Sequence, residues 1–73
     1  MNGDAMRIDY KKTIVRIRAQ LGLSQQGLAD LLDVTFQTVN RWENGHFEPT
    51  KIVKAKLENL MNENGIKPVL EEE

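Results

Sequence analysis

The chain has no cysteine, so neither a disulfide framework nor a thiolate metal site is available to this protein of 73 residues. A domain of this size buries about 60% of the surface that its unfolded chain exposes, and it is therefore only modestly stable. Apolar packing alone must close the fold. The length allows one small domain, over residues 1–73.

Reactive side chains are also scarce, because the sequence holds one serine, Ser24, and one histidine, His46. An enzyme needs convergent reactive groups, and these residues do not supply them. His46 lacks the spacing of a metal-ligand set, and no glycine-rich phosphate cradle is present. We therefore expect a protein that is not an enzyme and has no catalytic, metal or cofactor site.

Long apolar runs are missing as well. No stretch approaches the roughly 18 residues that a membrane-spanning helix needs. The first ten residues, MNGDAMRIDY, have neither the basic start nor the apolar core of a secretory signal. We expect a cytoplasmic protein that makes no membrane contact.

Charge is unevenly distributed along the chain, although the formal net charge is only -1. Residues 10–57 contain eight Lys and Arg residues and four acidic ones, whereas Glu58, Glu63 and the final EEE make the C-terminal end acidic. A basic central region suits a polyanionic partner. The same charges also serve to keep a small domain soluble, and charge alone does not separate these two interpretations.

Helical periodicity predicts four helices. The first is expected over residues 10–21, after the cap Asp9, and the second from the cap Ser24 to about Leu32. A third is expected between Thr35 and Gly45, and a fourth between Thr50 and Gly65. The expected buried stripe of the fourth helix comprises Val53, Leu57, Leu60 and Met61, with Ile52 on its margin. No alternating strand pattern is present, so the fold class is all-α, with a core over about 9–65 and flexible tails at 1–8 and 66–73.

Residues 14–50, IVRIRAQLGLSQQGLADLLDVTFQTVNRWENGHFEPT, carry a more specific pattern. This stretch resembles the lambda-repressor-like (phage repressor and Cro, or XRE-type) helix-turn-helix family. The matching positions are Arg18, Gly22, Leu23, Ser24, Gln25, Leu28, Ala29, Val34, Val39, Glu43, Asn44 and Gly45. Two positions depart from the family: Asp33 stands where the turn often has glycine, and Gly27 replaces a helix-forming, often acidic residue.

The residues themselves support such a helix pair. Ala29 is small where two helices joined by a short turn cross at close range, and a larger side chain would separate them. The resemblance further implies an ion pair between Arg18 and Glu43. Breaking such a pair costs about 3 to 5 kcal/mol if it is desolvated, or less than about 1 kcal/mol if it is exposed.

The resemblance implies binding of double-stranded DNA, with the third helix in the major groove. The implied base-reading residues are Phe36, Gln37 and Arg41, with Thr38 and Asn40 alongside. Gln37 suits adenine, Arg41 suits guanine or a phosphate, and Phe36 suits thymine methyl groups. For Phe36, a position in the core or against a partner is the alternative.

The implied phosphate contacts are Gln25, Asn44, Lys51 and Lys54. Gln25 begins the second helix, where free backbone N–H groups favour an anion. For Lys51 and Lys54, a solvated helix face is the alternative interpretation.

A domain of this size reads only a few base pairs, so we expect a homodimer on two half-sites about 34 Å apart. The fifth helix often found in the family is reduced here to IKPVLEEE, whose Ile66, Val69 and Leu70 either pair across the dimer, contact another partner or stay disordered. The function predicted is that of a transcriptional repressor acting at an operator. The alternative is a protein-interaction module, or an antitoxin that binds a toxin through its tail and represses its own operon.

Overall fold

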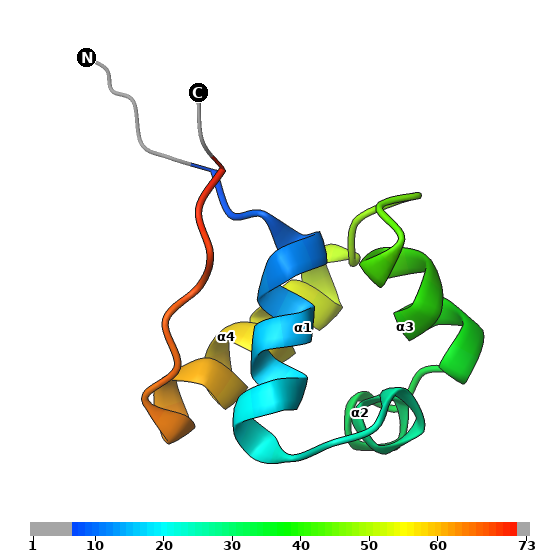
Figure 1. Cartoon of the computed structure of the whole chain (residues 1–73), viewed down its shortest axis with the longest axis horizontal. Coiled ribbons are helices and arrows are strands. Elements are labelled where there is room, and N and C mark those ends of the chain that lie inside the picture. The colour runs from blue at the N-terminus through cyan, green and yellow to red at the C-terminus, as the bar shows by residue number, and fades with distance from the viewer. Residues whose placement is uncertain (1–6, 72–73) are drawn as a thin grey trace.

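The computed structural model describes residues 7–71 of the chain. Four helices follow one another: α1 (Tyr10–Leu21), α2 (Gln25–Leu32), α3 (Phe36–Glu43) and α4 (Lys51–Asn64). Figure 1 shows α1 in front of α4, with α2 and α3 to the right of α1. The all-α class and the positions of the four helices predicted from the sequence are confirmed.

Local capping explains where the helices begin and end. Each helix starts after a residue whose side-chain oxygen accepts a hydrogen bond from the backbone N–H three positions further on. These four caps are Asp9, Ser24, Thr35 and Thr50. α1 and α4 end where Gly22 and Gly65 turn the backbone into the left-handed region, as predicted.

The turn between α2 and α3 contains Asp33, at the position where the family often has glycine. Asp33 is left-handed, with φ 61° and ψ 45°, a conformation that glycine adopts more easily than aspartate. The backbone N–H of Val34 then donates to the carbonyl of Ala29 at 2.9 Å. Ala29 is fully buried, so its small side chain lets the two helices approach closely.

The core draws on all four helices. Its buried apolar side chains are Ile14, Ile17, Leu28, Ala29, Leu32, Val39, Trp42, Val53, Leu57, Met61 and Ile66. Leu60 is only half-buried, and Ile52, placed on the margin of the α4 stripe, is 72% exposed. Trp42 and Val39 anchor the inner side of α3, which leaves the outer side of that helix free.

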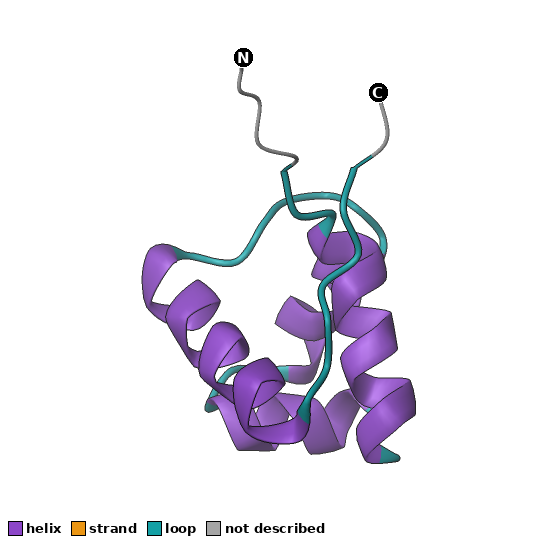
Figure 2. Cartoon of the chain, turned by 90° about the vertical axis from the view of Figure 1, so that its left-hand side faces the viewer, coloured by secondary structure: helices purple, strands orange, loops and turns teal. Residues whose placement is uncertain are grey.

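The C-terminal strap, residues 66–71, differs from the flexible tail that the sequence predicted. Ile66 is buried in the core, and the strap then runs as an extended chain back towards residues 7–9 (Figure 2). The Asp9 backbone N–H donates to the carbonyl of Val69 at 2.8 Å, and the Glu71 N–H donates to that of Arg7 at 2.7 Å. No helix forms in the strap.

A polar side chain in the core explains why the strap is ordered. Thr13 of α1 is fully buried, and its Oγ1 accepts from the Val69 N–H at 3.0 Å and donates to the Val69 carbonyl at 3.2 Å. Arg16 also donates to the carbonyl of Lys67 at 3.0 Å. Residues 7 and 8, assigned to the other flexible tail, join this pairing, whereas residues 1–6 and 72–73 of the predicted tails lie outside the described part.

Within residues 7–71, no helix has both the length and the apolar character needed to cross a membrane.

Candidate nucleic-acid interface

The outer side of α3 carries the side chains that the sequence assigned to base reading. Phe36 is 45% exposed, and Gln37 and Arg41 are also exposed. Val39 and Trp42, on the opposite side of the helix, are buried. The alternative of a core position for Phe36 is therefore wrong. These three side chains share one accessible surface, which we call the α3 outer face.

Thr38 and Asn40, expected alongside the base readers, are only half-exposed and already have partners. The Thr38 hydroxyl lies 2.8 Å from the hydroxyl of Thr35, the cap of the helix. The Asn40 side chain donates to Gln25 Oε1 at 3.3 Å and accepts from the Asn44 side chain at 3.1 Å. Both residues therefore help to hold α3 as well as lining its edge.

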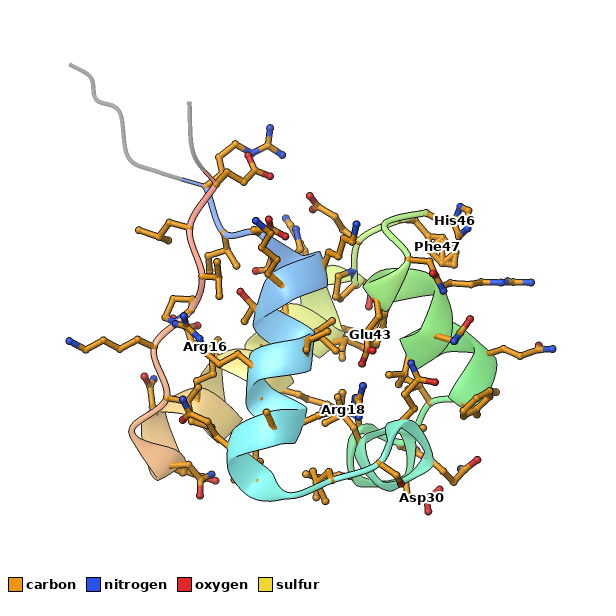
Figure 3. The ribbon with its side chains drawn as sticks, viewed as in Figure 1. Arg16, Arg18, Asp30, Glu43, His46 and Phe47 are labelled. Carbon is orange, nitrogen blue, oxygen red and sulfur yellow. The ribbon has the colours of Figure 1, made fainter. Side chains whose placement is uncertain are left out.

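An ion pair between α1 and α3 fixes the C-terminal end of α3. Arg18 Nε donates to Glu43 Oε2 at 2.6 Å, and Nη2 donates to Glu43 Oε1 at 2.9 Å. The Arg18 side chain is 24% exposed and that of Glu43 only 9%, so the pair is partly buried. Figure 3 shows the two residues facing each other between α1 and α3. Two parallel hydrogen bonds fix the angle between the two helices as well as their distance.

The environment of this pair shifts both pKa values in the direction that favours the charged forms. Burial raises the pKa of Glu43, but the hydrogen bonds from Arg18 and Gln25, together with the positive charge of Arg18, outweigh it and lower the pKa below its ordinary value. The hydrogen bond to Glu43 raises the pKa of Arg18 despite the opposing effect of burial.

Gln25, expected at a phosphate, links the ion pair to the edge of the α3 outer face. Its Nε2 donates to Glu43 Oε1 at 2.9 Å, while its Oε1 accepts from Asn40. A chain of contacts thus runs from Arg18 through Glu43, Gln25 and Asn40 to Asn44. The sequence analysis had assigned Gln25 and Asn44 to phosphate contacts and Asn40 to the base-reading set, and it gave no indication that their side chains meet.

The two lysines expected at phosphates have different surroundings. Lys51, the first residue of α4, is exposed. Lys54 is half-buried: its Nζ donates to Glu48 Oε1 at 3.0 Å and lies 4.9 Å from the centre of the Tyr10 ring. Lys54 therefore already has partners within the protein, whereas Lys51 forms no ion pair among residues 7–71.

Phe47 is an exposed aromatic residue near the α3 outer face that the sequence analysis did not single out. Its side chain is 46% exposed, and its ring centre lies 5.9 Å from the guanidinium carbon of Arg41. Figure 3 shows Phe47 beside His46 in the loop that follows α3. The only hint in the sequence was an aromatic residue shortly after the glycine that ends the third helix.

A family model described as helix-turn-helix matches residues 14–66. The match begins inside α1, contains all of α2, α3 and α4, and ends at the first residue of the C-terminal strap. No curated protein and no solved structure matches the chain. The α3 outer face, the ion pair and the chain of amides that joins them all lie inside the matched region.

Proposed function

Because the chain belongs to the lambda-repressor-like helix-turn-helix family of DNA-binding regulators, we propose that it binds double-stranded DNA sequence-specifically and represses transcription by occupying an operator. The observation that carries this proposal is the split of α3 into two sides. Val39 and Trp42 anchor one side in the core, while Phe36, Gln37 and Arg41 stand exposed on the other. A major groove is wide enough to admit a helix presented in this way.

Each exposed side chain on the α3 outer face has chemistry suited to a base edge. Gln37 can pair with N6 and N7 of adenine, and Arg41 with O6 and N7 of guanine. Phe36 suits the methyl group of thymine. Thr38 and Asn40 take secondary places at the edge, because their polar atoms already have partners within the protein.

Contacts to phosphate would set the position of α3 without reading sequence. Gln25 is the first residue of α2, and the first backbone N–H groups of a helix favour an anion. Asn44 and Lys51 flank the loop that follows α3. We include Lys54 only as a minor member of this set, because its ammonium already donates to Glu48.

Two copies would bind as a homodimer on half-sites about 34 Å apart, since one domain of this size reads few base pairs. Occupancy of such a site in the cytoplasm would block transcription. The competing proposals are a pure protein-interaction module, and an antitoxin that binds a toxin through its tail and also represses its own operon. The salt dependence of DNA binding tests the first of these, because a pure protein binder should show no such dependence.

Selection of bound sequences from a pool of random duplexes tests the proposal. The wild-type protein should enrich one sequence, and its affinity should fall steeply between low and moderate salt. Arg41→Ala should relax the preference at one or two base pairs. Lys51→Ala should weaken binding to all sequences alike and reduce the salt slope by about one unit.

Lys67→Ala is the matched control for charge, because Lys67 is exposed on the strap, which lies on the other side of α1 from α3 (Figure 1). It should leave sequence preference unchanged. Enrichment of no sequence, or retention on DNA that ignores salt, would reject DNA recognition and favour a protein partner. Equal behaviour of all three variants would reject the assigned docking face.

A further inference from the structure

The loop after α3 turns sharply back towards the helix that it leaves. Gly45 is left-handed, with φ 77°. Its N–H donates to the carbonyl of Trp42 at 3.0 Å, and the N–H of His46 donates to the carbonyl of Arg41 at 3.1 Å. This pair of hydrogen bonds is typical of a Schellman motif, which satisfies the last carbonyls of a helix and reverses the chain. Phe47 follows directly and is thereby returned to the last turn of α3.

The returned ring lies beside the head group of Arg41. The 5.9 Å between the guanidinium carbon and the ring centre is within the range of about 6 Å over which a cation and an aromatic face attract. Among residues 7–71, the cations that form ion pairs are Arg7, Arg18 and Lys54. Arg41 is not one of them, so the ring is the contact that restrains its guanidinium.

A ring restrains an arginine differently from a carboxylate. A carboxylate would occupy the N–H donors of the guanidinium and cancel its charge, whereas an aromatic face leaves its five donors free for another acceptor. Restricting a long side chain before it binds also lowers the conformational entropy lost on binding. Arg41 is therefore held and remains available for a base.

We propose that Phe47 is a positioning residue for Arg41, which holds the guanidinium ready for its base pair and so sharpens discrimination at that pair. The inference rests on the proposed function, and it adds a specificity determinant from outside α3. Phe47 touches Arg41 and not the base itself in this scheme.

Two substitutions of Phe47 separate the effect of its aromatic face from the effect of its apolar bulk. The side chain also lines a hollow with Val34, Trp42 and Val53. Phe47→Leu keeps an apolar side chain against this hollow but removes the aromatic face. Phe47→Trp keeps an aromatic face and presents a stronger one to a cation.

The experiment measures affinity for two duplexes. The first carries the sequence that the wild-type protein selects, and the second differs from it only at the base pair where Arg41→Ala loses its preference. The ratio of the two affinities is the quantity compared between variants. For the wild-type protein this ratio measures the discrimination due to Arg41. Phe47→Leu should lower the ratio about two- to fivefold, the size expected for an exposed cation–π contact, while Phe47→Trp should retain it. In an Arg41→Ala background, Phe47→Leu should change the ratio no further.

A structural role for Phe47 would give a different pattern. The inference would be overturned if Phe47→Leu and Phe47→Trp gave equal ratios. It would also be overturned if Phe47→Leu lowered the ratio by the same factor in the Arg41→Ala background as in the wild-type protein. An unchanged ratio for Phe47→Leu would also overturn the inference, provided that the protein still selects a sequence and still needs Arg41 to do so. That result would leave the proposed function standing. A wild-type protein that selects no sequence would instead reject the proposed function itself.

Discussion

Replacing Glu43 with glutamine removes the charge that pairs with Arg18 while preserving the shape of the side chain. The Glu43 side chain is 9% exposed and that of Arg18 is 24% exposed. Breaking a fully buried pair costs about 3 to 5 kcal/mol because it leaves one charge without a partner. Arg18 retains some contact with water, so we expect the free energy of unfolding at neutral pH to fall by roughly 2 to 3 kcal/mol.

The same contact makes this loss depend on pH. Because the pKa of Glu43 is lowered in the folded state, its contribution is complete above its unfolded value, close to 4.5. The contribution is lost as the pH falls below that value and through the folded pKa. The difference in stability between the wild-type protein and Glu43→Gln should therefore be constant near neutral pH and shrink below about pH 4.5.

Urea denaturation, followed by the fluorescence of Trp42, which is 3% exposed, measures the free energy of unfolding at neutral pH and its change on acidification. Glu63→Gln is the matched control, because Glu63 lies on the exposed side of α4. It should cost less than about 0.5 kcal/mol. A Glu43→Gln variant as stable as this control at neutral pH, or a difference that grows on acidification, would refute the role given to the ion pair.

Two further substitutions test the strap and the turn. Thr13→Val keeps the size of the buried side chain but removes both hydrogen bonds to Val69. It should lower the free energy of unfolding by about 1 to 2 kcal/mol and accelerate hydrogen exchange at the Val69 amide. An unchanged exchange rate would contradict the role of Thr13 as the anchor of the strap. Asp33→Gly should stabilise the protein by roughly 0.5 to 1 kcal/mol because φ is 61° there, while Asp33→Ala should destabilise it. If thermal unfolding showed the Ala variant to be more stable than the Gly variant, strain at the turn would be excluded.

Local chemistry explains why the helices were predictable from the sequence. A cap such as Ser24 acts on a backbone N–H only three residues away, and a glycine such as Gly22 acts on the turn that it occupies. For Asp33, which is left-handed, the indication came from the resemblance, because the family often has glycine at this position in the turn. None of these features depends on where a distant segment packs.

Two features that the sequence analysis did not anticipate depend on contacts that form only in the folded chain. The strap is ordered through Thr13, 56 positions before Val69, and a single buried threonine gives no warning of such a partner. Lys54, which the resemblance assigned to a phosphate, meets Glu48 and the Tyr10 ring in the folded chain, and the sequence analysis anticipated neither contact. Each of these side chains has ordinary chemistry, and only the packing of the chain decides which neighbour it meets.

The ion pair also resolves an electrostatic difficulty in the proposed interface. Glu43 is the last residue of α3, and an unpaired carboxylate there would repel the phosphates that the helix must approach. Arg18 neutralises it from the protein side, and Gln25 shares the same Oε1. The α3 outer face therefore presents the charge of Arg41 without a competing acid from its own helix. The residues that fix the angle of α3 are thus the ones that keep its surface suited to an anion.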